Sequence, residues 1–292
     1  MRPPSMPQPS LSLSIISLLL CAAAAAPVAA QAPAPELVDL VNRYRAEAPA
    51  CAGRIAAPLR PLQSDSDLAR VRIDRADALP AALERAGYLA ARAQAVVVSG
   101  PRDAPGAMTV LRERYCSVLL DPDFRRIAAT RAERDTWRLL LARPLLAADL
   151  PLSPEAGREV LAQVNAARGR ARSCGERRFA AAPALRWNPA LAQTALGHSE
   201  DMARNDHFEH RGRDGSDAAQ RATRNGYRWR RIGENIAAGQ GDPAQVVAGW
   251  IASPGHCVNL MERAYTEMGA GYAIDPASQG KIYWTQVFGT PR

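Results

Sequence analysis

The chain has 292 residues and a formal net charge of +8, and 47% of its residues are hydrophobic. This hydrophobic content excludes an intrinsically disordered chain, and the length suggests two domains. The positive charge is almost all arginine, with Lys281 as the only lysine. A basic surface could contact an anionic polymer or lipid, but solvated arginines explain the charge more simply, so we expect no nucleic-acid partner.

Residues 1–30 are typical of a secretory signal. Arg2 precedes an uncharged apolar run over residues 11–26, and the small residues at 28–30 predict cleavage after Ala30. The apolar run is too short for a membrane span. Leu20 stands before Cys21, where a lipid-anchored protein has a small residue. We therefore expect a secreted or periplasmic protein that does not span a membrane.

Export changes the meaning of the cysteines. Cleavage removes Cys21 and leaves an even number, namely Cys51, Cys116, Cys174 and Cys257. An even number of cysteines in an oxidising compartment predicts disulfides, and four cysteines allow three connectivities.

The first half of the chain, residues 31–150, is predicted to be mostly helical. Apolar residues at helical spacing and Gly-Pro breaks place three helices, over 36–48, 79–97 and 108–119. Short strands are predicted over 127–130 and 137–141. Pro144 and the prolines at 151 and 154 mark the boundary with a second domain, residues 151–292.

The second half begins with a predicted amphipathic helix over 155–168. Good N-caps followed by helix formers predict further helices, which start after Asn188, after Ser216 or Asp217, and after Asp242; a short helix starts at His256. Strands are expected over 231–238, 268–274 and 282–288, and the last two form an antiparallel pair.

All four histidines lie between His198 and His256. His198 follows Leu191 by seven residues on one helix face, so we expect it to pack in the core, whereas His207 should face solvent. His210, Glu234 and His256 are the candidate metal ligands. Two imidazoles and a carboxylate suit zinc, with water at an open position that could be activated for hydrolysis. The alternative is a hydrogen-bonded polar cluster.

The two halves share a pattern of spacing. Asn42 precedes Cys51 by nine residues, as Asn165 precedes Cys174. Beyond the second cysteine of each half, Cys116, Leu119, Phe124 and Ile127 have the spacing of Cys257, Leu260, Tyr265 and Met268. We hypothesise that residues 31–150 are a degenerate copy of residues 151–292. An unrelated helical domain is the alternative.

The hypothetical repeat has two consequences. It selects one disulfide within each half, Cys51–Cys116 and Cys174–Cys257, and closing the second loop would stabilise the fold by roughly 4–5 kcal/mol on the chain-entropy model. It also places Tyr115 where the second half has His256. The first half would therefore keep the scaffold and lack the site.

The second half also carries a series of motifs in a fixed order. They are Phe208-Glu209-His210, Gly233-Glu234-Asn235-Ile236-Ala237, Val247-Ala248-Gly249-Trp250, Ser253-Pro254-Gly255-His256, Met268-Gly269-Ala270-Gly271 and Tyr283-Trp284-Thr285-Gln286-Val287-Phe288-Gly289. Over residues 155–289 this series resembles the CAP superfamily, which groups cysteine-rich secretory proteins, antigen 5 allergens and plant pathogenesis-related proteins with many bacterial members. The resemblance implies an α+β fold, an α-β-α sandwich with a largely antiparallel sheet.

The resemblance also implies a site. Family members keep a cleft of two histidines and two acidic residues, which in some binds a divalent metal such as zinc. His210, Glu234 and His256 match three of these positions, and Ser253 stands at the fourth, which leaves three ligands. Reading Ser253, His256 and Glu234 as a nucleophilic triad lacks the glycine pattern of a nucleophile elbow, so no catalytic residue is assigned.

The predicted function is a non-enzymatic extracytoplasmic binding module whose cleft holds zinc. The resemblance suggests a lipid, a sterol, or an envelope or host-surface component as partner. The first alternative is a zinc-dependent hydrolase or peptidase that uses the same cleft. The second is a structural envelope protein with a vestigial cleft.

Overall fold

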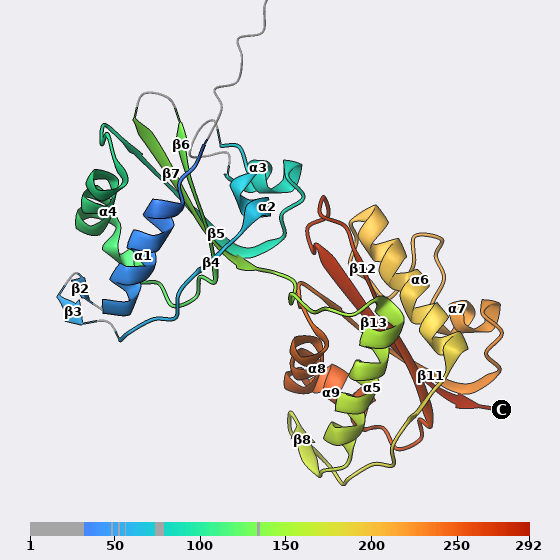
Figure 1. Cartoon of the computed structure of the whole chain (residues 1–292). Helices are drawn as coiled ribbons and strands as arrows, with labels where there is room; N and C mark the ends of the chain where they lie inside the picture. Colours follow the sequence, from blue (N-terminus) through green and yellow to red (C-terminus); the bar gives the residue numbers. More distant parts are fainter. Residues whose placement is uncertain (1–31, 48, 52, 56, 74–78, 133–134) are drawn as a thin grey trace, which may run out of the picture.

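The computed structural model describes residues 32–47, 49–51, 53–55, 57–73, 79–132 and 135–292. The predicted export signal and its cleavage site lie outside these residues. Each half of the chain is built around its own sheet (Figure 1). No helix among the described residues is both long and apolar enough to cross a membrane.

The first half contains helices of 4 to 16 residues and a five-stranded sheet of order β1-β6-β7-β5, with β4 added in parallel to β6. Its elements are β1 (Ala32–Pro33), α1 (Pro35–Glu47), β2 (Ala50–Cys51), β3 (Arg54–Ile55), β4 (Gln63–Ser64), α2 (Ser66–Ala69), α3 (Leu79–Arg85), β5 (Ala90–Ser99), α4 (Ala104–Leu119), β6 (Arg126–Ala132) and β7 (Thr136–Pro144). The expectation of a mostly helical first half is therefore corrected.

The main correction concerns residues 79–97, which were predicted as one helix. The helix α3 ends at Arg85, and residues 90–99 form the long strand β5, paired antiparallel with β7. Two β-branched residues of β5, Val96 and Val98, are buried in the core, and Val97 between them is exposed. This alternation favours a strand, and the ladder with β7 outweighs the helix propensity of the preceding alanines.

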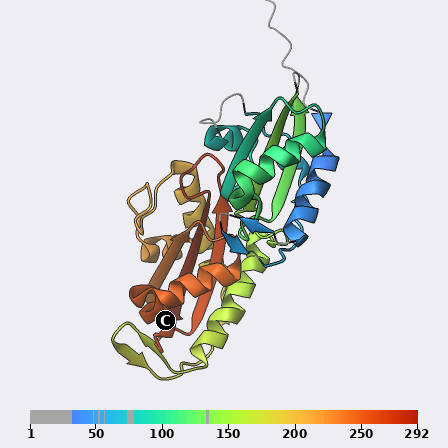
Figure 2. The same ribbon diagram turned by 90° about the vertical axis from the view of Figure 1, so that its left-hand side faces the viewer.

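The second half has a four-stranded sheet of order β10-β12-β13-β11 that is antiparallel except for the β10–β12 pair. Its elements are α5 (Ser153–Arg168), β8 (Arg172–Cys174), β9 (Arg177–Phe179), β10 (Arg186–Trp187), α6 (Pro189–Asn205), α7 (Ala218–Arg224), β11 (Trp229–Ala238), α8 (Pro243–Ala252), α9 (Pro254–Met261), β12 (Glu267–Ile274) and β13 (Ile282–Pro291). Helix α6 lies on one side of the sheet, and α5, α8 and α9 lie on the other (Figures 1 and 2). This is the expected α-β-α sandwich.

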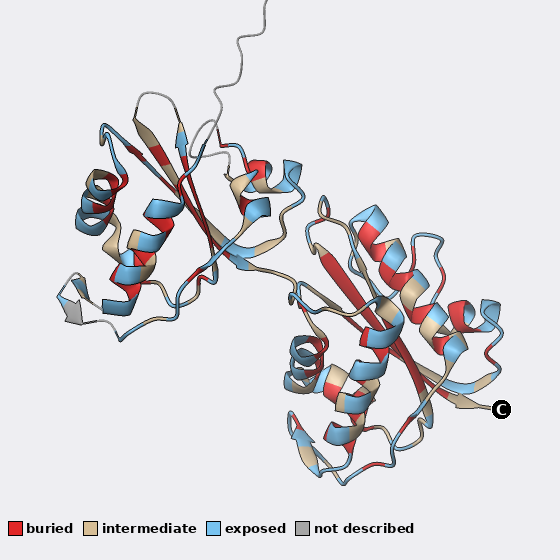
Figure 3. Cartoon of the chain, viewed as in Figure 1, coloured by how far each residue is buried: buried red, intermediate tan, exposed pale blue. Residues whose placement is uncertain are grey.

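The helices of the second half pack closely on the central strands, whose residues are largely buried (Figure 3). A Cβ at Gly157 of α5 would lie 2.4 Å from the carbonyl oxygen of Ala270 in β12. On the opposite face, a Cβ at Gly269 would lie 2.0 Å from the backbone nitrogen of Ala192 in α6. Glycine at both positions therefore lets a helix approach each face of the same strand.

One disulfide forms within each half, and both pairs are those selected by the repeat. Cys51 is bonded to Cys116, and Cys174 is bonded to Cys257. In each half, the disulfide joins the two-stranded ribbon after the first helix to a later helix, α4 or α9.

An asparagine in the first helix of each half fixes a backbone segment twenty residues further on. The Asn42 side chain donates to the carbonyl oxygen of Leu62 at 3.0 Å and accepts from its backbone nitrogen at 2.8 Å. Asn165 makes the same two bonds with Leu185, at 2.9 and 2.8 Å. The segments so fixed lead directly into β4 and β10.

A buried arginine follows in each of these helices. Arg45 and Arg168 are 1% and 0% exposed. Each donates from Nε to a carbonyl fifteen residues later and from Nη1 to two carbonyls beyond the second cysteine. The acceptors are Arg60, Leu119 and Asp121 for Arg45, and Pro183, Leu260 and Glu262 for Arg168. Burial lowers the pKa of Arg168 to about 10, which still leaves it protonated at neutral pH.

Candidate functional site

The candidate site lies where the loop after α6 meets β11. Asn188 caps α6 by accepting from the backbone nitrogens of Ala190 and Leu191. The helix ends at Asp206, which has a left-handed conformation (φ 45°) and turns the chain into the loop that carries His210. Glu234 is in β11, where it pairs with Val287 of β13.

His210 and Glu234 are in direct contact. The Nδ1 atom of His210 lies 2.8 Å from Oε1 of Glu234. The glutamate side chain is 4% exposed, whereas the imidazole is 59% exposed. A buried carboxylate therefore holds one ring nitrogen and leaves the Nε2 side of His210 open to solvent.

Arg221 occupies the other oxygen of the same carboxylate. Its Nη2 donates to Oε2 of Glu234 at 2.7 Å, and also to the carbonyl oxygen of His210 at 3.0 Å. Its Nη1 donates to the carbonyl oxygen of Ser216 at 2.7 Å. This arginine from α7 was absent from the sequence prediction. Its partner is thirteen residues away and no local pattern links the two positions.

His198 lies behind the pair and is fully buried, in agreement with a packing role. Its Nε2 is 3.0 Å from the carbonyl oxygen of Glu209 and 3.8 Å from Oε1 of Glu234. Its Nδ1 has no hydrogen-bond partner in the described part of the chain. Burial lowers the pKa of His198, which keeps the ring neutral beside Glu234.

His256 lies in the first turn of α9, and its backbone is bonded to β11, the strand that carries Glu234. Its carbonyl oxygen accepts from the side chain of Asn235 at 3.2 Å, and Asn235 also donates to Oε1 of Gln286 at 3.2 Å. Asn259 donates to the carbonyl of Glu234 at 3.2 Å and to Oδ1 of Asn235 at 3.1 Å. The buried amides of Asn235 and Gln286 thus join β11, β13 and α9.

The two candidate imidazoles have opposite pKa shifts. The hydrogen bond to Glu234 raises the pKa of His210. Burial, and then the charge of His210, lower the pKa of His256. Protonation is therefore favoured at His210 and disfavoured at His256.

Both oxygens of the predicted ligand Glu234 bond to neighbouring side chains, one to His210 and the other to Arg221. No group of three or more histidine, cysteine, aspartate or glutamate side chains among the described residues is placed to hold a metal ion. Ser253, at the junction of α8 and α9, makes no side-chain cap bond.

His207 departs from the prediction of a solvent-facing residue. Its side chain is 10% exposed, with Nε2 at 3.6 Å from Oδ2 of Asp201. Neither ring nitrogen has a hydrogen-bond partner among the described residues. The chain turns back at Asp206, which brings the residue after it against α6.

Comparison with known proteins places residues 161–288 in a family, because they match the model of the cysteine-rich secretory protein family, CAP. Two curated relatives from Bacillus subtilis (strain 168) align over 104 residues, 36% of this chain. They are the uncharacterized membrane protein YlbC, 35% identical over 28% of its length, and the uncharacterized protein YkwD, 33% identical over 38% of its length. The chain thus spans less than half of either relative.

Solved structures are similar at lower identity. An extracellular protein containing an SCP domain from Bacillus anthracis str. Ames is 24% identical, with 56% of each chain covered and a TM-score of 0.39. An outer surface protein from Borrelia burgdorferi is 17% identical, with 47% of this chain and 94% of that chain covered and a TM-score of 0.38. On the family match, residues 161–288, which contain the His210–Glu234 pair, form a CAP domain of the cysteine-rich secretory protein family.

Proposed function

We propose that the CAP domain is an extracytoplasmic binding module that holds a divalent metal such as zinc between His210 and His256. The observation that carries this proposal is the 2.8 Å contact of His210 Nδ1 with the buried Glu234. A carboxylate bonded to one imidazole nitrogen fixes the ring and makes the other nitrogen a better metal ligand. Zinc bound there would supply a Lewis acid with open positions for a ligand.

Glu234 has a supporting role in this proposal. Arg221 holds the carboxylate in place through its second oxygen, so His210 is presented in one orientation. The amides of Asn235 and Asn259 fix the backbone at His256 and at Glu234 in the same way. Two protein ligands hold a metal less tightly than three or four, so we expect micromolar rather than nanomolar affinity.

Binding is favoured over hydrolysis by the same contacts. A hydrolase would need a carboxylate or imidazole free to take a proton from water. Glu234 is bonded to both His210 and Arg221, both imidazoles are metal ligands in this proposal, and no observation favours the hydrolase over the binding module. The two disulfides support an oxidising, extracytoplasmic location. The partner class, a lipid, sterol, or envelope or host-surface component, stays a prediction.

Calorimetric titration of residues 31–292 with zinc tests the proposal. We expect micromolar binding that is lost in the double variant His210→Ala/His256→Ala. Glu234→Gln should weaken binding by about 10–100-fold, the usual effect of removing a partner of a metal-bound histidine. His207→Ala is the matched control, because this histidine is in the same loop and contacts Asp201 instead. Equal binding by the double variant would refute the metal site.

We further propose that residues 31–150 are a copy of the CAP domain without the site. Three matching features support this proposal: the disulfides, the bonds from Asn42 and Asn165 to a backbone segment twenty residues later, and the buried arginines. The same titration tests it through stoichiometry. We expect one zinc ion per chain. A second zinc site, formed by residues 31–150 and unaffected by the His210→Ala/His256→Ala variant, would contradict a copy that lacks the site.

A further inference from the structure

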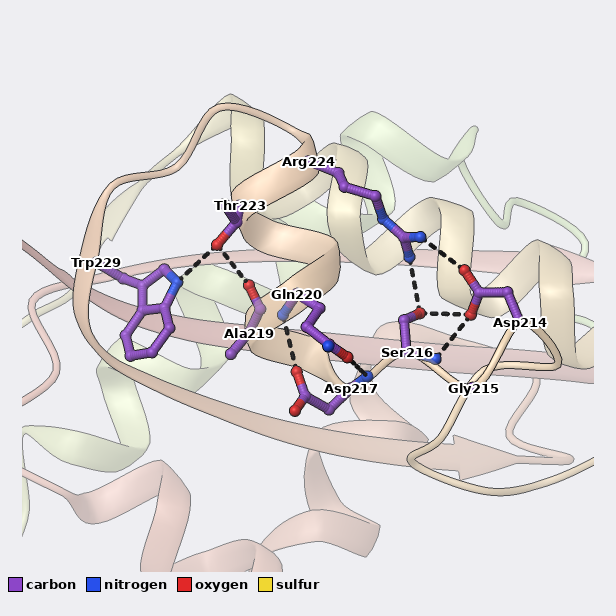
Figure 4. Close-up of a pocket in the computed structure, with 9 residues that line it drawn as sticks. All are labelled: Asp214, Gly215, Ser216, Asp217, Ala219, Gln220, Thr223, Arg224 and Trp229. Carbon is purple, nitrogen blue, oxygen red and sulfur yellow. Dashed lines mark hydrogen bonds and ion pairs between the residues drawn. The ribbon is translucent and has the colours of Figure 1, made fainter.

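A groove extends from the candidate site along α7. Its two cavities, of about 510 and about 610 Å³, share the lining residues Asp217, Ala219 and Trp229. The first also contacts His210 and Glu234, and the second continues to Asp214 and Arg224 (Figure 4). Trp229 therefore stands at the centre of a groove that starts beside the histidine pair.

The indole of Trp229 is held at its polar edge. Its Nε1 donates to Oγ1 of Thr223 at 3.0 Å, and this hydroxyl donates to the carbonyl oxygen of Ala219 at 2.9 Å (Figure 4). The ring is half-buried, whereas Trp137, Trp250 and Trp284 are buried in the cores. A fixed, partly exposed aromatic ring in a groove offers an apolar surface to a ligand at little cost in conformational entropy.

Polar groups with unused bonding capacity lie beside the ring. Asp217 and Gln220 form the capping box of α7, which uses Oδ1 of the aspartate and Oε1 of the glutamine. Within the described residues, Oδ2 of Asp217 and Nε2 of Gln220 make no hydrogen bond. One acceptor and two amide hydrogens thus border the groove next to the apolar ring.

The charges along the groove balance. Asp214 is paired with Arg224 at 2.7 Å and Glu234 with Arg221 at 2.7 Å, and Arg211 lines the same cavity as Asp217. Because the groove has one carboxylate for each arginine, it has no excess of positive charge to attract a polyanion. The groove therefore favours a neutral ligand that combines an apolar face with hydroxyl groups.

We propose that this groove binds a neutral saccharide, with one pyranose ring stacked on Trp229 and its hydroxyls bonded to Asp217 and Gln220. A pyranose presents a C–H face and a rim of hydroxyls, which matches the ring and the two side chains beside it. Each cavity is within the size range of small-molecule sites. This inference rests on the proposed function as a binding module and names the class of its ligand.

Titration of residues 31–292 with neutral tetrasaccharides of N-acetylglucosamine and of glucose tests the proposal, by tryptophan fluorescence and calorimetry. We expect saturable binding of at least one tetramer, weakened about tenfold in Trp229→Ala, largely restored in Trp229→Phe, and reduced in Gln220→Ala. Trp187→Phe is the matched control, because Trp187 is also half-buried but packs against Arg158 outside the groove.

Two outcomes would overturn the saccharide site: no saturable binding of either tetramer, or unchanged affinity in both Trp229→Ala and Gln220→Ala. Tighter binding of a sulfated polysaccharide through the same residues would also overturn it, because the ligand would then be anionic. Zinc titration distinguishes failure of the saccharide site from failure of the proposed metal site. Trp229→Ala should bind zinc like the unaltered chain, and failure of zinc binding alone leaves the saccharide result standing.

Discussion

The two halves of the molecule share a disulfide, an asparagine side-chain contact and a buried arginine at matching positions, and they differ where the candidate site lies. In the long antiparallel pairs, Val98 faces Trp137 in the first half and Ala237 faces Trp284 in the second. Counting three residues back from Val98 and Ala237 places Ala95 in the position of Glu234. The carboxylate that holds His210 is thus a methyl group in the first half.

Two positions next to Glu234 are also polar in the second half and apolar in the first. The buried amides of Asn235 and Gln286 correspond to Val96 and Leu139, which are 3% and 1% exposed and face each other across the strands. A buried polar pair adds little net stability over an apolar pair of similar size. The first half forms its antiparallel strand pair without these amides, so we expect the amides of the second half to matter for the site more than for the sheet.

The covering of the sheet differs as well. The second half has α6, a helix of 17 residues, followed by the loop with His210. The first half has α2 and α3, of 4 and 7 residues. The shorter segments include no histidine, so the first half lacks both imidazoles and their carboxylate.

The largest effect should come from the arginines that the halves share. Arg45→Met and Arg168→Met should each destabilise the protein by about 3–5 kcal/mol, because several buried carbonyls lose their donor at once. Urea unfolding followed by tryptophan fluorescence measures both. Two exposed arginines nearby, Arg43 in α1 and Arg170 just after α5, are the controls, and their Met variants should change stability by less than about 0.5 kcal/mol. A large loss of stability in only one of the two variants, Arg45→Met or Arg168→Met, would contradict the equivalence of the two arginines.

A smaller effect is expected from converting the second half toward the first. Asn235→Val alone should cost about 1–3 kcal/mol, because Gln286 and the carbonyl of His256 lose their partner. The double variant Asn235→Val/Gln286→Leu removes both amides and should recover part of that loss. A double-mutant cycle with urea unfolding measures the coupling. The variants Val96→Ala and Leu139→Ala and their double variant measure the coupling of the corresponding apolar pair in the first half.

Zinc titration of this double variant then sharpens the comparison. If the amides serve the site, the variant should fold and bind zinc more weakly, because His256 is no longer anchored. Unchanged zinc affinity would mean that the polar pair has no part in the site.

Much of this arrangement could be predicted from local sequence signals. The spacing of cysteines gave the pairs Cys51–Cys116 and Cys174–Cys257, and Asn188-Pro189 and Asp242-Pro243 gave the starts of α6 and α8. These features depend on neighbouring residues or on matched spacing. The strand conformation of residues 90–99 could not be predicted in this way, because it depends on pairing with β7, a strand more than thirty residues away.

The site shows the same limit. The motifs placed His210, Glu234 and His256 in one region, but the bonds that define their roles come from residues outside the motifs or from buried contacts. Arg221 donates to the second oxygen of Glu234, and the turn at Asp206 buries His207. Both effects arise from tertiary packing, which residue type and spacing do not encode.

The smallest effect concerns pH and the two imidazoles. The pKa of His210 is raised in the folded state, so its stabilising contribution is fully present below its unfolded pKa of about 6.5 and is lost as the pH rises through the raised value. His210→Ala should therefore cost more stability at pH 5 than at pH 8.

His256 should show the opposite dependence. Its pKa is lowered, so protonation in the unfolded state destabilises the fold as the pH falls below about 6.5. His256→Ala removes this penalty and should cost less at pH 5 than at pH 8. Urea unfolding of both variants at the two pH values, with a chelator present, measures the difference. The same sign for both variants would contradict the opposite roles of the two rings, in which a carboxylate favours protonation of His210, whereas burial and then the charge of His210 disfavour protonation of His256.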